Sequence, residues 1–150
     1  MEKKNRKQLE ELNGILRETD ELYHTAARAL GLSDCAFWIL YTLRDQPEAP
    51  TQSAICNSIY APKQTVNSAL KKLERAGTIR LASGSDRRQK RIVPTEKGEA
   101  LIQETIDAVR RAECRALNRL NNGEQREFLR LYRRFTDALR HELAYFEKRE

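Results

Sequence analysis

The chain has 150 residues, of which 39% are hydrophobic and 33% are charged, and its formal net charge at pH 7 is +6. This composition is typical of a globular protein with one compact domain, or with a small domain and a helical arm. No apolar run approaches the roughly 18 residues of a membrane span, and the N-terminus lacks the features of a signal peptide, so we expect a cytoplasmic protein without a membrane partner.

A long helix with one narrow apolar stripe is predicted over the first thirty residues. Apolar side chains recur there at alternating spacings of three and four, and the other faces are charged. The stripe contains Leu9, Leu12, Leu16, Thr19, Tyr23, Ala26 and Leu30. Because it is narrower than the core-facing side of an ordinary helix, the stripe predicts contact with a partner helix. Gly31 ends the helix, since glycine readily takes positive φ.

Three shorter helices are predicted between residues 33 and 77. The first begins at its cap Ser33 and runs to about Arg44, the second runs from Gln52 to about Ile59 with Thr51 as its cap, and the third runs from Pro62 to Ala76. Serine and threonine are favoured N-caps, and proline is favoured in the first turn of a helix. Two prolines between the first and second of these helices predict a loop, and Gly77 ends the third helix.

Two short strands and two further helices complete the predicted elements. The β-like runs are 78–82 and 90–94, and the polar, glycine-containing segment 83–89 between them predicts a hairpin loop. Thr95 is placed as the cap of a long helix that continues to about Leu120. Asn122 and Gln125 have capping-box spacing for a last helix. Its apolar stripe, which again favours a partner helix, contains Phe128, Leu131, Phe135, Leu139, Leu143 and Phe146.

The excess positive charge lies in one segment of the chain. Nine basic and two acidic residues lie between Pro62 and Arg91, a net charge of +7, whereas the rest of the chain has a net charge of −1. A uniformly solvated surface would spread such a charge over the molecule, but a surface that binds a polyanion concentrates it. The segment therefore indicates a nucleic-acid interface.

The helix predicted from Pro62 to Ala76 has the character of a DNA-recognition helix. Val66, Ala69, Leu70 and Leu73 follow helical spacing and predict one buried face. The outward residues are Lys63, Gln64, Thr65, Asn67, Ser68, Lys71 and Lys72. Their amides and hydroxyls can read base edges, and their lysines can hold phosphates. A basic amphipathic helix alone is also typical of an ordinary solvated surface, but the adjoining basic hairpin favours a winged helix-turn-helix module.

These residues resemble the MarR family of regulators. Residues Asp86 to Gly98 read DRRQKRIVPTEKG, which is similar to the family's wing signature D-x-R-x-x-x-[VI]-x-L-T-x-x-G, with Pro94 in place of leucine. A strand end tolerates proline, so this departure does not threaten the fold. Upstream, Gln64 to Asn67 and Leu73 to Gly77 resemble the recognition helix and its glycine stop. The resemblance covers about residues 32–101.

The resemblance implies a mainly α fold (α+β), in which a winged helix-turn-helix module is flanked by N- and C-terminal helices that form a dimerisation body. The expected domains are 1–31, 32–98 and 99–150. The residues expected at the dimer interface are Leu9, Leu12, Leu16, Phe135, Leu139, Leu143 and Phe146. In the wing, Arg87 and Arg88 would contact DNA, with Arg88 in the minor groove and Asp86 holding it in place. A salt bridge within the hairpin is the alternative role for Asp86 and Arg88.

An effector pocket is also expected by analogy, because family members often hold a small molecule where the dimer body meets the DNA-binding module. Aromatic and polar side chains that could line it are Tyr23, His24, Arg28, Trp38 and Tyr41. The alternative is that Trp38 and Tyr41 simply fill the core. The sequence names no ligand.

The cysteines and histidines form no motif for catalysis or metal binding. Cys35, Cys56 and Cys114 are too irregularly spaced for a disulfide framework or a zinc site, so we expect no metal and no other cofactor. Neither His24 nor His141 has a carboxylate arrangement suited to a general base, and no nucleophile motif or P-loop is present. We therefore expect no enzyme, and we expect both histidines on helix surfaces.

The sequence thus predicts a sequence-specific transcriptional regulator, expected to be a repressor. It would act as a homodimer on an inverted repeat in double-stranded DNA, with a small-molecule effector as a further expected partner. One alternative is a winged-helix adaptor that binds a protein, but the local net charge of +7 argues for DNA because an adaptor needs no basic wing. Another is a cysteine-based redox sensor that uses the same fold.

Overall fold

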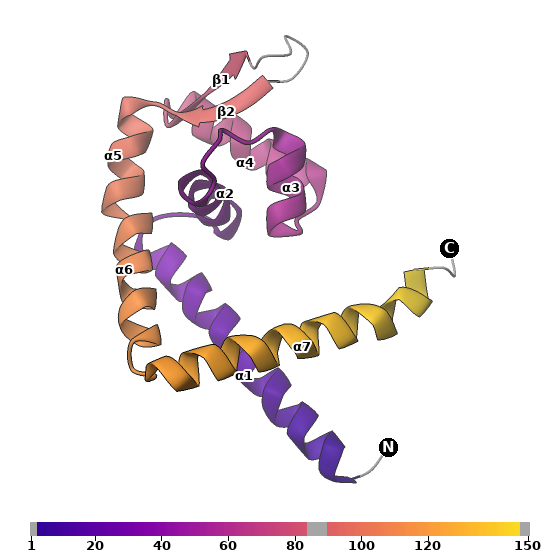
Figure 1. Ribbon diagram of the computed structural model, residues 1–150. Helices are drawn as coiled ribbons and strands as arrows, with labels where there is room; N and C mark the ends of the chain where they lie inside the picture. The colour runs from indigo at the N-terminus through magenta and orange to yellow at the C-terminus, as the bar shows by residue number, and fades with distance from the viewer. Residues whose placement is uncertain (1–2, 84–89, 148–150) are drawn as a thin grey trace. The chain divides into compact units, whose positions relative to one another are not determined.

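The described part of the chain forms seven helices and one two-stranded antiparallel sheet (Figure 1). The computed structural model describes residues 3–83 and 90–147. In chain order the elements are α1 (Lys3–Ala29), α2 (Asp34–Asp45), α3 (Gln52–Ile59), α4 (Lys63–Arg75), β1 (Ile79–Ser83), β2 (Lys90–Pro94), α5 (Glu96–Glu104), α6 (Ile106–Leu117) and α7 (Asn122–Glu147). The predicted mainly α fold with a small sheet is confirmed.

Two compact units divide the chain. The first ends at Val109 and contains the helices α1 to α5 with the sheet, and the second begins at Arg110 and contains α7. The helix α6 therefore runs from one unit into the other. Among the helices described, none has both the length and the apolar character needed to cross a membrane.

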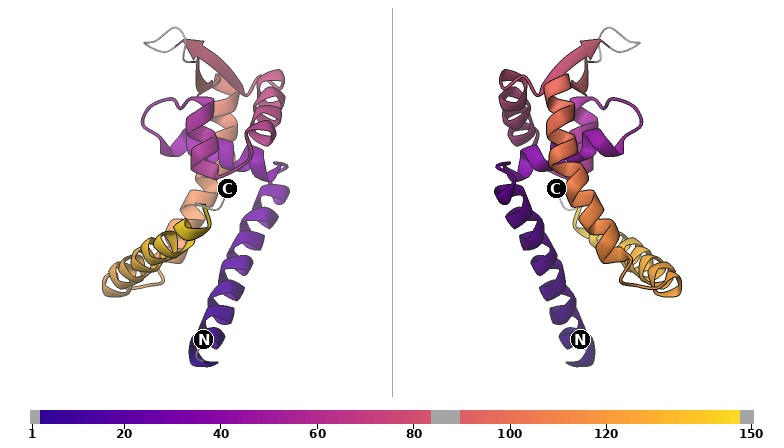
Figure 2. Two further views of the ribbon diagram at one scale, coloured as in Figure 1. Left: turned by 90° about the vertical axis from the view of Figure 1, so that its right-hand side faces the viewer. Right: turned by 90° about the vertical axis from the view of Figure 1, so that its left-hand side faces the viewer.

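The core of the first unit forms around α2, which contacts α1, α3, α4, α5 and β2 (Figures 1 and 2). Phe37, Ile39 and Leu40 of α2 are fully buried, as are Ile55 of α3 and Val66 of α4. Each such side chain contributes roughly 1.5–3 kcal/mol through burial. The helix α2 is therefore the support on which the pair α3 and α4 is held.

The predicted N-caps of α2, α3 and α5 and the two predicted glycine stops are confirmed. The capping hydrogen bonds run from Ala36 N to Ser33 Oγ (3.3 Å), from Ala54 N to Thr51 Oγ1 (3.2 Å) and from Gly98 N to Thr95 Oγ1 (3.0 Å). A cap of this kind contributes about 1 kcal/mol. Gly31 and Gly77, which follow α1 and α4, take φ angles of 72° and 71°. These boundaries depend on side chains within one helical turn, which is why the sequence predicts them.

The long helix predicted from Thr95 to about Leu120 is wrong in one respect, because it is interrupted at Thr105, between α5 and α6. The Thr105 hydroxyl donates a hydrogen bond to the carbonyl oxygen of Leu101 (2.6 Å). Such back-bonding by a threonine side chain disturbs regular helix geometry. The apolar periodicity continues across the interruption, so the sequence pattern alone does not reveal it.

An arginine of α2 connects the two helices on either side of this interruption. Arg44 Nη2 lies 2.7 Å from Glu99 Oε1 on α5 and 3.0 Å from Asp107 Oδ2 on α6. Partial burial lowers the pKa of the guanidinium, but the hydrogen bond to Glu99 and the charge of Asp107 outweigh it and raise the pKa above its usual value. The ion pairs thus hold the start of α6 against the core.

The capping box of α7 lies one residue earlier than predicted. Asn121 Oδ1 accepts hydrogen bonds from the N–H groups of Gly123 (2.9 Å) and Glu124 (3.1 Å), and Glu124 Oε2 accepts from Asn121 N (2.8 Å). The predicted partner Gln125 instead donates through Nε2 to the Leu120 carbonyl oxygen (2.9 Å), beyond the end of α6. The prediction of a capping box between Asn122 and Gln125 is therefore wrong, because the Gln125 side chain binds a carbonyl that follows the preceding helix.

Gly98 permits a close approach between α5 and the residue that precedes β1. A Cβ atom at this position would lie 1.9 Å from the carbonyl oxygen of Thr78. The same oxygen accepts hydrogen bonds from Thr95 N (3.0 Å) and Thr95 Oγ1 (3.2 Å). The T-x-x-G part of the wing signature therefore has a structural reason, since it lets α5 begin directly against Thr78.

We expect Gly98→Ala to lower the free energy of unfolding by about 3 kcal/mol, because the new methyl group would overlap a backbone atom that cannot rotate away. Gly14→Ala in α1 is the matched control. Its Cβ would meet nothing within 4 Å, and alanine is favoured over glycine inside a helix by roughly 1 kcal/mol. Urea denaturation at one fixed protein concentration compares the variants. Wild-type stability of Gly98→Ala would contradict the close contact with Thr78.

Candidate nucleic-acid interface

The helix α4 buries one face and exposes the other. Its buried residues are Val66, Ala69, Leu70 and Leu73, which are the four that the periodicity predicts. Its exposed residues include Lys63, Gln64, Thr65, Ser68, Lys71 and Lys72, whereas Asn67 is half-buried. The structure therefore brings all of the predicted recognition residues except Asn67 to one open surface.

The lysines of α4 form no ion pair with a residue that the structure describes. Elsewhere, basic side chains pair with acids one helical turn away, as Arg6 does with Glu10 in α1 (3.0 Å). Within residues 3–83 and 90–147, by contrast, no ion pair involves Lys63, Lys71 or Lys72. A phosphate backbone that approached this surface would therefore displace no ion-pair partner found among the described residues.

Three further basic residues on α4 and the hairpin are exposed but are not in the predicted set. Arg75 lies on the same face of α4 as Gln64 and Lys71, since their spacing follows the helical period. Arg80 of β1 and Lys90 of β2 are also exposed. All three lie in the basic segment found from the sequence. The sequence shows their charge but not their exposure, so they were counted in the basic segment without being predicted as contact residues.

The C-terminal end of α4 is fixed by contacts with the next elements. After Gly77, the N–H of Thr78 donates a hydrogen bond back to the carbonyl oxygen of Leu73 (2.9 Å). Lys97 Nζ on α5 donates to the carbonyl oxygen of Ala76 (2.6 Å). The ammonium group thus satisfies a carbonyl at the negative end of the helix dipole. Both contacts hold α4 in a defined position relative to the hairpin.

The hairpin is attached to the loop before α3. Its strands pair antiparallel, with Ile79 opposite Pro94 at one end of the ladder, and Ile92 N donates to the carbonyl oxygen of Pro50 (2.8 Å). Arg91 Nη1 donates to the carbonyl oxygen of Ala49 (2.9 Å), so this arginine serves the fold although it adds to the net charge of the segment.

The three wing residues expected to act on DNA are Asp86, Arg87 and Arg88, and they lie outside the residues that the structure describes. Their expected roles therefore rest on the resemblance of the sequence motif. The strands on either side of them are described, and each presents an exposed basic side chain, Arg80 or Lys90.

A hollow of about 350 Å³ lies against α1 and α2. It is lined by Arg17, Asp20, Glu21, Tyr23, His24, Asp34 and Trp38. Of the residues expected in an effector pocket, Tyr23, His24 and Trp38 are therefore brought together. Tyr41 lines a second hollow of about 360 Å³, which shares Trp38 with the first, and Arg28 lines neither of these two.

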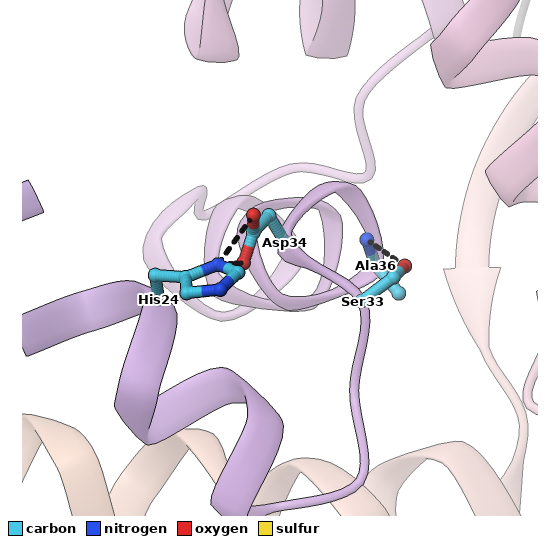
Figure 3. A network of polar contacts seen from close by, with 4 residues as sticks. All are labelled: His24, Ser33, Asp34 and Ala36. Atoms are coloured by element: carbon cyan, nitrogen blue, oxygen red, sulfur yellow. Dashed lines mark hydrogen bonds and ion pairs between the residues drawn. The ribbon is translucent and has the colours of Figure 1, made fainter. Parts of the chain in front are cut away.

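His24 on α1 points at the carboxylate of Asp34 at the start of α2 (Figure 3). Its Nδ1 lies 2.9 Å from Oδ1 and 2.8 Å from Oδ2 of Asp34, close to the cap that Ser33 forms with Ala36. The sequence pattern showed no carboxylate arrangement at His24 suited to a general base, and it did not predict this contact with Asp34. The turn at Gly31 brings the two residues together, and local spacing does not show this. The contact links α1 to α2 at the edge of the first hollow.

Trp38 is the centre of an aromatic cluster. Its ring centroid lies 5.1 Å from that of Tyr23, 5.1 Å from that of Phe37 and 5.5 Å from that of Tyr41. Tyr23, Trp38 and Tyr41 are partly buried and pack against the core cluster that contains Phe37. Trp38 and Tyr41 therefore help to fill the core and also line a hollow, so the two roles considered from the sequence are compatible.

The cysteines do not converge on a reactive site. All three are free, with Cys35 and Cys56 half-buried and Cys114 exposed. Burial, and to a smaller extent the nearby Cys56, raises the pKa of the Cys35 thiol. A raised pKa lowers the fraction of reactive thiolate, which disfavours a redox role for Cys35. Among the residues described, no group of three or more His, Cys, Asp or Glu side chains is arranged to hold a metal ion.

The two predicted dimer stripes leave apolar side chains at the surface. The residues Phe135, Leu139, Leu143 and Phe146 of α7 and Leu9 of α1 are exposed, and Leu12 and Leu16 of α1 are half-buried. Phe128, Leu131 and Tyr132 of α7 are also exposed. Exposed large apolar side chains along one helix mark a protein interface more often than open solvent, and this holds for each stripe by itself.

The chain is similar to known transcriptional regulators over most of its length. A model of the MarR family matches residues 30–89. An HTH-type transcriptional repressor of Mycobacterium tuberculosis is 36% identical over 107 residues, which cover 71% of this chain and 76% of the repressor.

Two solved structures share the fold. A MarR family regulator from Neisseria meningitidis has a TM-score of 0.79 and 21% identity, with coverage of 92% of this chain and 97% of that chain. A DNA complex of Staphylococcus aureus MepR has a TM-score of 0.71 and 19% identity, with coverage of 85% and 93%.

Proposed function

Because the chain belongs to the MarR family, we propose that it is a homodimeric repressor that binds an inverted repeat in double-stranded DNA. The observation that carries the proposal is the open face of α4, where amides, hydroxyls and lysines without ion pairs in the described part of the chain lie beside a hairpin with further basic residues. A winged-helix adaptor has no use for such a surface. The solved MepR complex is a relative in fold that binds DNA.

Base reading is assigned to the exposed amide of Gln64. It lies in the first turn of α4, and a glutamine amide can form two hydrogen bonds with the edge of an adenine in the major groove. Thr65 and Ser68 offer hydroxyls on the same open surface, while the half-buried Asn67 contributes less than the sequence suggests. Lys63, Lys71 and Lys72 would hold phosphates and so position the helix.

The wing is assigned a second contact by analogy with the family. Arg88 would enter the minor groove, where a narrow groove concentrates negative potential, with Asp86 holding it and Arg87 adding charge. Arg80 and Lys90 on the described strands are exposed and add positive charge to the hairpin. The wing and α4 together would then contact two neighbouring grooves.

Dimerisation is assigned to the exposed apolar stripes of α1 and α7. A two-fold dimer presents two copies of α4, so its operator is an inverted repeat with half-sites about one helical turn apart, roughly 34–36 Å. A small-molecule effector is assigned to the hollow at Tyr23, His24 and Trp38, since aromatic walls and a few polar groups are typical of ligand sites. Because this hollow involves α2, a ligand there would act on the helix that supports α4.

The variants Gln64→Ala and Lys71→Ala separate base reading from phosphate binding. Gln64→Ala should weaken binding to the operator by about 5- to 150-fold, equivalent to about 1–3 kcal/mol, and weaken binding to a random duplex far less. Lys71→Ala should weaken both duplexes alike and reduce the slope of log K against log salt by about one. Fluorescence anisotropy titrations at several salt concentrations measure both effects.

The operator for this test is the strongest-binding duplex that the wild-type protein selects from a random pool. Equal losses on both duplexes for Gln64→Ala would place Gln64 on the DNA backbone and not on a base. If the wild-type protein enriched no duplex and bound neither DNA at low salt, the proposed function would be contradicted.

The variants Arg88→Ala and Arg91→Ala remove the same charge from the hairpin and test the role of the wing. Arg88→Ala should weaken binding to both duplexes and lower the salt slope by about one, with an unchanged free energy of unfolding. Arg91→Ala loses the hydrogen bond to the Ala49 carbonyl oxygen, so it should cost about 1–2 kcal/mol of stability and leave the salt slope unchanged. Urea denaturation and anisotropy titration give the two readouts. Wild-type affinity and slope for a folded Arg88→Ala would exclude the wing contact.

Leu139→Glu tests the dimer. Sedimentation equilibrium of the wild-type protein at micromolar concentration should give twice the chain mass of 17.4 kDa, and Leu139→Glu should shift the mass towards 17.4 kDa because it places a charge in an apolar contact. The matched control is His141→Glu, two residues along and on the opposite face of α7, which should remain dimeric. A wild-type mass of 17.4 kDa would contradict the homodimer.

A further inference from the structure

Tyr60 has a conformation and an exposure that the fold does not explain. It ends α3 with φ 50° and ψ 34°, in the left-handed region, and among residues 3–83 and 90–147 it is the only non-glycine residue with positive φ. Its side chain is 94% exposed, whereas the next most exposed large hydrophobic residue of the described chain, Leu22, is 64% exposed.

Both features cost stability in the isolated protein. A residue with a Cβ is disfavoured in the left-handed region, where glycine or asparagine is the usual choice. An aromatic ring that is almost fully exposed recovers none of this cost through burial. The aromatic contacts of the first unit gather around Trp38 and Phe37 on α2. Among the described residues, Tyr60 takes part in none of these contacts. A small residue at this position would therefore serve the fold of the free protein better.

The surroundings of Tyr60 do not resemble a protein interface. Its exposed neighbours along the chain are Asn57, Ser58, Pro62 and Lys63, which are polar, basic or small. The exposed apolar residues that form stripes lie on α1 and α7 instead. A single exposed tyrosine among polar side chains suits a polar partner. Such a partner can accept a hydrogen bond from the hydroxyl and contact the ring.

The position of Tyr60 in the fold indicates that partner. In a helix-turn-helix the second helix enters the major groove and the first crosses the backbone, so the turn between them lies at the edge of the groove. Tyr60 occupies this turn, between the last residue of α3, Ile59, and the first of α4, Lys63. The chemical group found at the groove edge is the sugar–phosphate backbone. Tyrosine hydroxyls are common donors to its phosphate oxygens.

We propose that Tyr60 is a DNA-backbone contact whose phenol hydroxyl donates a hydrogen bond to a phosphate oxygen beside the groove that α4 enters. The proposal rests on the proposed function and adds a contact to it. Because the phenol carries no positive charge, it displaces no condensed counterion from the DNA. Its contribution therefore differs from that of a lysine in a measurable way, since it strengthens binding without changing the salt dependence.

The decisive variant is Tyr60→Phe, which removes only the hydroxyl. We expect binding to the selected operator and to a random duplex to weaken together by roughly 3- to 10-fold, with an unchanged slope of log K against log salt. Lys71→Ala, measured in parallel, provides the contrast in which the slope falls. Tyr60→Gly removes the ring and the backbone cost, so it should bind both duplexes at least as weakly as Tyr60→Phe while its Tm rises by about 2–4 °C.

The outcomes separate this proposal from the function on which it rests. Wild-type affinity of Tyr60→Phe, with normal DNA binding by the wild-type protein, would overturn the Tyr60 contact and leave the proposed function standing. A loss confined to the operator would also overturn it, since Tyr60 would then read a base. So would a lower sedimentation mass for Tyr60→Gly, which would place Tyr60 against a second copy of the chain. Absence of DNA binding by the wild-type protein would instead contradict the function itself.

Discussion

The backbone carbonyl of Thr78 is the point at which α4, the hairpin and α5 are joined. It accepts hydrogen bonds from Thr95 N (3.0 Å) and Thr95 Oγ1 (3.2 Å), and α5 can pass close to it because Gly98 has no side chain. The N–H of Thr78 donates in turn to Leu73 at the end of α4 (2.9 Å). The hydrogen bonds of this one residue thus connect the end of α4 to the starts of β1 and α5. A looser junction would let the hairpin and α4 move independently.

The position of α4 also depends on what lies beneath it. The helix α2 supplies the buried apolar surface on which α3 and α4 rest, and Arg44 connects the end of α2 to both α5 and α6 (2.7 Å to Glu99 and 3.0 Å to Asp107). At its other end, α2 is linked to α1 through Asp34 and His24 (Figure 3). A ligand that moved α1 against α2 would thus act on the support of the proposed DNA-reading surface, and this would give the proposed effector a physical route to DNA binding.

Basic side chains serve two different purposes in this protein. Lys97 donates to the carbonyl oxygen of Ala76 at the end of α4 (2.6 Å), and Arg91 donates to the partly buried carbonyl oxygen of Ala49 (2.9 Å), so both side chains satisfy backbone carbonyls. Lys63 and Lys71 face solvent instead. An acid of the protein paired with either lysine would compete with a phosphate for the same positive charge. The contact proposed for Tyr60 would add an uncharged donor to this surface, since its ring is 94% exposed.

The sequence by itself determined the local features of this protein. The helical periods, the caps at Ser33 and Thr95, the stop at Gly77 and the character of the open face of α4 all depend on residues within a few turns of one another, so pattern and propensity suffice to predict them. Only the tertiary structure decided which charges are used internally. Arg91 reaches Ala49 and His24 reaches Asp34 across turns of the chain, and the close approach of α5 to Thr78 depends on how separate elements pack. A count of charges along the sequence tells how many basic side chains are present. It does not tell which of them point to solvent and which bind a backbone carbonyl, because contacts between distant segments decide this.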